Sequence, residues 1–375
     1  MKRSSRSHGR RSARPVAGFV TAGALVVLAA CSGGDDASPA TVVTTTAAAA
    51  TTVAPTSSTE APATTSVDTA APTTTEAPLG PVMPLSGLPV DDEIRASLPA
   101  LVAKIDNHPS ARPQFGLNSA DIVFEENVEQ LTRFAAVFQG AVVDRIGPIR
   151  SGRTQDVDLL GSLAGPMFVW SGGNPSVTKA INDSDLVSLS PATTRSVGFF
   201  REERADESSE HTLYARVTEM YASFTPPFAP APTSQFVYRA SGERAVGRAG
   251  AGADLAMDRV AVSWRWDAGS SSYLRDQDGE PHATADGGQV NAANVIVLEV
   301  EYLPSPADAR SPEAQTVGSG VAHVLTDGVL VTGTWSRADR TATFELRDES
   351  GSLIKLTPGR TWVELARTGK FSPVG

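Results

Sequence analysis

The apolar positions of the chain follow two patterns, and the pattern changes at a proline-rich stretch near residue 230. Before that stretch, apolar runs of strand length alternate with runs whose apolar residues fall at helical spacing. The strand-like runs cover residues 101–105, 121–126, 132–139 and 167–170, and the helix-like runs cover residues 154–163, 175–181 and 211–224. This order predicts a mixed sheet covered by helices.

Two short motifs in this part predict where elements turn or begin. Residues 127–131 connect two strand-like runs, which predicts a β-hairpin. Asn174 stands before Pro175, and these residue types favour the N-cap and the first turn of a helix.

After residues 224–232, apolar and polar residues alternate with a period of two. The alternating runs cover residues 260–266, 295–300, 322–325, 329–335, 341–346 and 362–365. Turn sequences such as Asp278-Gly279 and Asp327-Gly328 separate them. The sequence therefore predicts an α+β protein, with an N-terminal mixed α/β domain over residues 84–235 and a mainly β C-terminal domain over residues 236–375.

Residues 1–31 have the features of an export leader. An apolar run over residues 16–30 is shorter than the ~20 residues of a membrane-spanning helix. Basic residues precede this run, namely Lys2, Arg3, Arg6, Arg10, Arg11 and Arg14. The run ends in Leu28-Ala29-Ala30-Cys31, which resembles the lipobox of bacterial lipoproteins. Cys31 is the only cysteine of the chain, so it has no disulfide partner, and we expect it to carry a diacylglyceryl anchor.

Residues 32–83 consist almost wholly of Thr, Ala, Pro, Ser and Val. Such a composition cannot bury enough apolar surface to fold, so it predicts a disordered tether. An O-glycosylated stalk and an unmodified spacer are both compatible with it. Either would hold a folded head away from a membrane.

The net charge of the chain limits its partners. The formal charge is −10, and removal of the basic leader would make the mature chain more acidic. An acidic protein is a poor binder of nucleic acid, so an anionic ligand would need a local basic site. The expected partners are the membrane, through the diacylglyceryl anchor, and a cell-wall or envelope-protein ligand at the extracytoplasmic face of the cell membrane.

Ionisable and small residues gather between the apolar runs of residues 106–153 and at two later loops. We take the following as candidate ligand-binding residues: Asp106, Asn107, His108, Arg112, Glu125, Arg133, Arg150, Ser151, Arg153, Gly172, Gly173 and His211. Arg150 and Arg153 precede one predicted helix and Gly172 and Gly173 precede another, so free backbone N–H groups accompany the guanidinium groups. This arrangement predicts an anion pocket.

A structural alternative stays open for the same arginines. Arg133, Arg150 and Arg153 would then pair with Asp121, Glu125 and Glu126 and join neighbouring strands. Which of the two holds depends on whether the residues surround a concave surface.

A third hypothesis is acid–base hydrolysis by Asp106 or Glu125 with His108 or His211. Ser151 lacks the sequence context of a nucleophile elbow. The histidines lack metal-ligand spacing, so we expect neither a metal nor a cofactor.

Several motifs together are similar to those of the YerB-like lipoproteins, a bacterial family whose biochemical role is not established. They are Ile105-Asp106-Asn107-His108-Pro109, Ala111-Arg112-Pro113-Gln114, Leu131-Thr132-Arg133-Phe134, Gly147-Pro148-Ile149-Arg150-Ser151, Ser171-Gly172-Gly173, His211-Thr212-Leu213-Tyr214, Tyr273-Leu274-Arg275 and Gly333-Thr334-Trp335. The resemblance implies a two-part extracytoplasmic head on a lipid anchor and assigns no catalytic residue. The sequence thus favours a binding or partner-assembly module with an arginine-rich anion pocket, and the alternative is a cell-envelope hydrolase that uses Asp106, Glu125 and His211.

Overall fold

The computed structural model describes residues 80–141, 143–203 and 207–375. The predicted leader, the lipidation site Cys31 and residues 32–79 of the predicted tether lie outside these residues. Among the helices of these residues, none has both the length and the apolar character to cross a membrane.

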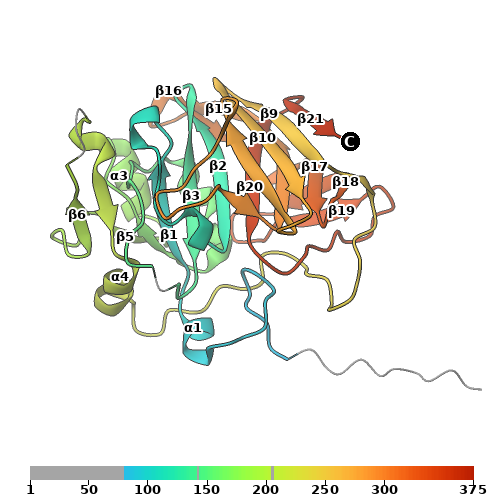
Figure 1. The fold of residues 1–375 in the computed structure, drawn as a ribbon. Coiled ribbons are helices and arrows are strands. Elements are labelled where there is room, and N and C mark those ends of the chain that lie inside the picture. Colours follow the sequence, from blue (N-terminus) through green and yellow to red (C-terminus); the bar gives the residue numbers. More distant parts are fainter. Residues whose placement is uncertain (1–79, 142, 204–206) are drawn as a thin grey trace, which may run out of the picture. The chain divides into compact units, whose positions relative to one another are not determined.

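Within the described residues, an 11-stranded sheet forms the centre of the fold (Figure 1). Its strands, in spatial order, are β19 (Glu345–Asp348), β18 (Val329–Arg337), β17 (Gly318–Thr326), β14 (Asn294–Val300), β20 (Thr361–Arg367), β2 (Ile122–Val128), β3 (Leu131–Phe138), β1 (Leu101–Asp106), β4 (Met167–Val169) and β5 (Val187–Leu189), with β8 (Arg248–Ala249) beside β18. Strands β2 and β20 pair in parallel, with Ile122 opposite Thr361. Both predicted domains therefore contribute strands to one sheet, and the predicted α+β class is confirmed.

A second sheet, from the C-terminal part of the chain, covers one face of the central sheet. Its strands are β12 (Glu280–Pro281), β11 (Ser272–Gln277), β10 (Val260–Asp267), β9 (Gly252–Met257) and β21 (Phe371–Val374), with β13 (Asn291–Ala292) beside β11. Trp264 of this sheet shares a buried cluster with Phe134 and Val297 of the central sheet. Two further antiparallel pairs are β15 (Tyr302–Ser305) with β16 (Asp308–Ala314) and β6 (Phe199–Arg201) with β7 (Leu213–Ala215).

Helices pack on both faces of the central sheet, although α1 has no buried residue. They are α1 (Glu93–Ser97), α2 (Gln155–Leu159), α3 (Pro175–Asn182) and α4 (Val217–Phe224), with short 3₁₀ helices at Pro109–Ala111, Leu117–Ser119, Gly161–Leu163 and Ser209–His211. Val177 of α3 and Leu159 of α2 pack with Phe124 and Ala135 on one face. Met220 of α4 packs on the other face, in the cluster that contains Phe134.

The two local motifs behave as predicted. Strands β2 and β3 form an antiparallel hairpin, and the turn residues Glu129 and Gln130 have positive φ angles of 53° and 73°. Helix α3 begins after Asn174, whose Oδ1 accepts a hydrogen bond from the N–H of Val177 at 2.9 Å.

The helix predicted for residues 211–224 is wrong in its first part. Residues Leu213–Ala215 form strand β7, and the helix begins only at Val217. The backbone of β7 is bonded on both edges, because Ile149 N donates to Leu213 O at 2.6 Å and β6 pairs on the other side. Tertiary pairing here outweighs the helical spacing of the apolar residues.

Two other predicted elements are shorter than expected. The helix of residues 154–163 divides into α2 and a 3₁₀ turn, and Gly161 lies against the backbone of Arg340. The strand of residues 341–346 begins only at Glu345, because the Asp339 carboxylate accepts hydrogen bonds from the N–H groups of Thr341 and Ala342 and closes a turn there.

Candidate functional site

The period-two geometry of the hairpin and of β1 divides the candidate residues between the two faces of the central sheet. In register, Asp106 lies opposite Arg133 and Ile105 lies opposite Phe134. Glu125 lies opposite Phe134 on the next strand. Since side chains alternate along a strand, Asp106 and Arg133 project from one face, and Glu125 projects from the other.

Arg133 is the least exposed of the candidate arginines. Its exposed fraction is 7%, and its Nη1 donates to the carbonyl oxygen of Ser151 at 2.8 Å. Burial, together with the nearby charges of Arg153 and Arg150, lowers its pKa to about 9. No carboxylate among the described residues forms an ion pair with Arg133. A buried guanidinium group with this environment is costly unless an anion accompanies it.

Arg150 and Arg153 flank Arg133, and we refer to the three residues as the arginine cluster. Arg150 Nε lies 3.4 Å from Asp106 Oδ2, and its Nη2 lies 2.7 Å from Glu210 Oε2. Arg153 Nη2 lies 2.7 Å from Glu129 Oε1. Both carboxylate partners at the outer ends of these arginines are largely exposed, so solvent screens these pairs.

A cavity of about 200 Å³ adjoins the cluster. It is lined by Glu129, Ser151, Arg153, Gly173, Asn174, Val177, Ser305, Asp308 and Ser311. Hydroxyl groups, an amide, a guanidinium group and two carboxylates thus surround a space of small-molecule size. Such a set is able to bind an anionic group through Arg153 and the serine hydroxyls.

Two histidines, His108 and His211, lie beside the arginine cluster. His211 Nδ1 is 2.7 Å from Asp106 Oδ2, and the rings of His108 and His211 stack with centroids 4.4 Å apart. His108 Nδ1 accepts a hydrogen bond from the N–H of Ser110 at 3.1 Å. Desolvation and the neighbouring His211 lower the pKa of His108. A carboxylate that orients an imidazole is the arrangement of a general base.

The opposite face of the sheet holds a separate, fully buried polar network. Arg275 Nη2 donates to both oxygens of Glu125 at 2.8 Å, and Trp362 Nε1 donates to Glu125 at 3.2 Å. Asn107 Nδ2 donates to Thr132 Oγ1 at 2.7 Å. This network joins the central sheet to β11 of the second sheet.

The same network holds ionisable groups whose pKa values are displaced. Burial and the adjacent Glu125 carboxylate raise the pKa of Glu364 well above its usual value. Burial and the Arg275 guanidinium group lower the pKa of His282 well below its usual value. Both shifts favour the uncharged form of the side chain.

The structure thus brings most of the candidates together and separates others. The residues around the cluster and its cavity are Asp106, His108, Arg133, Arg150, Ser151, Arg153, Gly173 and His211. Asn107 and Glu125 belong to the buried network instead. Arg112 lies 3.6 Å from Asp278, and the charges of Arg275 and Glu125 in the buried network act on it. Gly172 precedes Gly173 in a loop and has a φ of 110°.

The residues of this network that were not among the candidate ligand-binding residues are Arg275, Gln277, His282, Gln114 and Glu364. The sequence contains one signal that could have identified two of these residues. Arg275 and Gln277 stand at the same strand parity as the buried Tyr273, so the alternation of β11 places polar side chains inward. Within the described residues, no group of three or more His, Cys, Asp or Glu side chains is arranged to hold a metal ion.

Comparison with family models matches both parts of the chain. Residues 85–226 match the model described as "Protein of unknown function (DUF3048) N-terminal domain", and residues 253–363 match the corresponding C-terminal domain. The chain is 25% identical over 289 residues to "Putative lipoprotein YerB" of Bacillus subtilis (strain 168), a match that covers 75% of this chain and 85% of that protein.

A solved structure shows the same fold. The crystal structure of the YerB protein from Bacillus subtilis superposes with a TM-score of 0.68 at 20% sequence identity, and the match covers 79% of this chain and 100% of that one. The two domain models together match more than half of the chain, the YerB protein of Bacillus subtilis is similar to it in sequence and in fold, and the chain belongs to the DUF3048 family of proteins of unknown function.

Proposed function

We propose that this chain is a lipid-anchored extracytoplasmic envelope protein whose head binds an anionic ligand, of the phosphate or carboxylate class, at the arginine cluster. The lipobox that ends at Cys31 and the lipoprotein name of the Bacillus relative support the anchor. The composition of the cluster supports the ligand class, because guanidinium groups bind carboxylate and phosphate oxygens in a fixed geometry.

The observation that carries the proposal is the environment of Arg133. This side chain is buried beside two further arginines, and its described hydrogen bond goes to a neutral carbonyl oxygen. A bound anion would offset the mutual repulsion of the three guanidinium groups.

The three carboxylates that the sequence offered as partners of these arginines are engaged elsewhere. Glu125 pairs with Arg275 on the other face, and Glu126 pairs with Lys104. Asp121 Oδ2 accepts a hydrogen bond from the N–H of Gln139 at 2.8 Å. Lys104 and Arg275 thus pair with two of the three carboxylates that the sequence offered to the arginines, whereas Arg150 pairs with Asp106 and Glu210 and Arg153 pairs with Glu129. These pairings support a cluster that is not joined to Asp121, Glu125 or Glu126.

Substitution of Arg133 tests the proposal directly. We expect inorganic phosphate to raise the melting temperature of the native chain relative to chloride at equal ionic strength, because a ligand that binds the folded state stabilises it. Arg133→Gln should weaken phosphate binding by at least about tenfold, since it removes a buried charged partner. Isothermal titration with phosphate measures the change.

Arg347→Gln is the matched control, because Arg347 is an exposed arginine that pairs with Glu345 on β19. It should bind phosphate as the native chain does. Arg153→Gln provides a second variant should Arg133→Gln unfold. Unchanged binding in both cluster variants would refute the anion site.

The contact between Asp106 and His211 favours a second function, hydrolysis of an envelope polymer. In this alternative His211 acts as the base and Asp106 orients its ring. Glu125 takes no part, because it projects from the opposite face and is paired with Arg275.

Incubation of the purified protein with cell-wall fragments tests this second function. If it holds, soluble fragments appear, and Asp106→Asn lowers their rate of release by about a hundredfold or more, the usual scale of general base catalysis. Absence of release with the native chain would leave ligand binding as the function of the cluster.

A further inference from the structure

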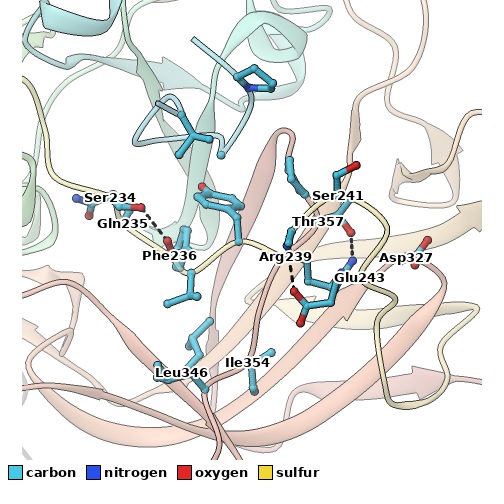
Figure 2. Close-up of a pocket in the computed structure, with 18 of the residues that line it drawn as sticks. Ser234, Gln235, Phe236, Arg239, Ser241, Glu243, Asp327, Leu346, Ile354 and Thr357 are labelled. Atoms are coloured by element: carbon cyan, nitrogen blue, oxygen red, sulfur yellow. Dashed lines mark hydrogen bonds between the residues drawn. The ribbon is translucent and has the colours of Figure 1, made fainter. Parts of the chain in front are cut away.

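Two cavities of the fold differ in the charges that line them. The larger, of about 1000 Å³, shares no lining residue with the cavity of about 200 Å³ that adjoins the arginine cluster. Figure 2 shows Arg239, Glu243 and Asp327 among the residues around the larger cavity. Among its described lining residues Arg239 is the one arginine, and it is accompanied by the carboxylates of Glu243, Asp327 and Glu345. The larger cavity therefore does not suit an anionic ligand.

The smaller cavity is lined by Ser151, Ser305 and Ser311 among others, and we call it the serine cavity. Its walls come from the turn between β2 and β3, the loop that carries the arginine cluster, the start of α3, and the β15–β16 pair. Its volume of about 200 Å³ lies below the range of about 300–1,000 Å³ in which pockets enclose drug-sized ligands. It therefore has room for one small ring rather than for an extended chain.

The two carboxylates that line the serine cavity are each paired with an arginine. Glu129 lies 2.7 Å from Arg153 Nη2, and Asp308 lies 3.0 Å from Arg310 Nη2. The neighbouring Arg133 forms no such pair within the described residues, and its hydrogen bond goes to a carbonyl oxygen of the cavity wall. An anionic group is therefore favoured at Arg133, and a neutral group is favoured inside the cavity.

The hydrogen-bonding capacity of the cavity indicates what kind of neutral group fits. Ser311 Oγ accepts from Arg153 Nε at 3.1 Å, and its own O–H meets no acceptor among the described residues. Glu129 Oε1 accepts from Arg153 Nη2, and no described donor reaches Glu129 Oε2. One position thus donates and another accepts. A hydroxyl group does both, so hydroxyl groups of a ligand are able to satisfy both positions.

We propose that the ligand of the arginine cluster is an acidic sugar, a sugar ring that carries a phosphate or carboxylate group. The inference rests on the function proposed above and adds the class of ligand. The anionic group binds at Arg133, and the ring enters the serine cavity, where its hydroxyl groups bond to Ser311 and Glu129. Val177, which also lines the cavity, packs against the C–H groups of the ring.

Two matched pairs of small ligands test the proposal on the native chain. Glucose 6-phosphate and propyl phosphate carry the same anionic group, but only the first has a ring with hydroxyl groups. By isothermal titration, glucose 6-phosphate is expected to bind at least about tenfold more tightly, because its hydroxyl groups add hydrogen bonds. Glucuronate and propionate give the same comparison for a carboxylate, so the pair with the larger preference identifies the anionic group.

Two variants show whether the preference arises in the serine cavity. Ser311→Ala removes the donor and should lower the ratio of the glucose 6-phosphate affinity to the propyl phosphate affinity by at least about threefold. Glu129→Ala removes the acceptor and releases Arg153 from its ion pair, so it should lower the same ratio while propyl phosphate binds more tightly. A variant that merely unfolds weakens both ligands together. The control is Ser319→Ala, an exposed serine on β17, which should leave the ratio unchanged.

The titrations separate failure of this proposal from failure of the anion site. If none of the phosphate and carboxylate ligands binds, the anion site is refuted, and the sugar site with it. If they bind but neither sugar binds more tightly than its matched ligand, the anion site stands and the sugar site is overturned. Persistence of the full preference in both Ser311→Ala and Glu129→Ala also overturns the sugar site.

Discussion

Arg275→Ala is expected to lower the free energy of unfolding by about 3–5 kcal/mol, the usual cost of leaving one partner of a buried ion pair uncompensated. Both Arg275 and Glu125 are fully buried, and the guanidinium group contacts both carboxylate oxygens at 2.8 Å. Removal of the arginine strands the Glu125 charge between the two sheets. Chemical denaturation followed by tryptophan fluorescence measures the loss.

Removal of Arg275 also breaks a hydrogen bond outside the ion pair. Its Nη1 donates to Gln277 Oε1 at 2.9 Å, and the same amide oxygen accepts from Asn107 at 3.0 Å. Trp264 and Trp362 pack edge to face beside the pair. A change at Arg275 therefore disturbs contacts of β2, of β20 and of Asn107, which follows β1, as well as contacts within β11.

Arg265→Ala supplies the matched control on the neighbouring strand β10. Arg265 pairs with Asp254 at 2.7 Å, but both side chains are more than 40% exposed. Exposed pairs contribute at most about 1 kcal/mol. If the two variants lost similar stability, the buried network would not be what joins the second sheet to the central one.

Much of the strand and helix pattern could be predicted from the sequence, because it depends on local spacing. The hairpin of β2 and β3 and the start of α3 at Asn174 follow from turn residues and an N-cap, which act within a few residues. The pairing of β2 with β20 could not be predicted in this way. It joins residues separated by more than 200 positions, as in the bond from Trp362 to Glu125, and periodicity contains no information on such pairing.

The candidate site was only partly predictable for the same reason. Period-two alternation places Asp106 and Arg133 on one face, but the loops that bring His211 and Arg150 to them follow from tertiary pairing. Glu125 was grouped with Asp106 because the two are near in sequence, whereas its strand position directs it to the opposite face. Its partner Arg275 lies 150 positions later in the chain.

Lys104→Met is expected to lower the free energy of unfolding by about 3–5 kcal/mol, as Arg275→Ala does. Lys104 lies on the face of the central sheet opposite the Arg275 network. Lys104 is fully buried, pairs with Glu126, and lies 2.6 Å from Asp156 Oδ1. Burial lowers its pKa to about 8 against the opposing effect of Asp156, so the ammonium group remains charged at neutral pH. Its removal leaves two buried carboxylates facing each other without a cation.

A combined variant separates the loss of the cation from the loss of packing. Lys104→Met together with Glu126→Gln and Asp156→Asn removes all three charges at nearly constant volume, and buried ion groups replaced as a set cost little stability. We expect most of the lost stability to return. Lys179→Met, which breaks an exposed pair with Asp183, should cost no more than about 1 kcal/mol.

The same variants connect the fold to the arginine cluster. Asp156 Oδ2 accepts a hydrogen bond from the N–H of Arg153 at 2.7 Å, so the Lys104 network positions the loop that carries this arginine. Lys104→Met should therefore weaken phosphate binding as well as stability. The combined variant retains an amide oxygen at residue 156 to accept that bond, and recovery of both stability and phosphate binding in it would show that Lys104 supports the cluster through this loop. Recovery of stability without recovery of binding would show instead that the cluster requires the charge of the network itself.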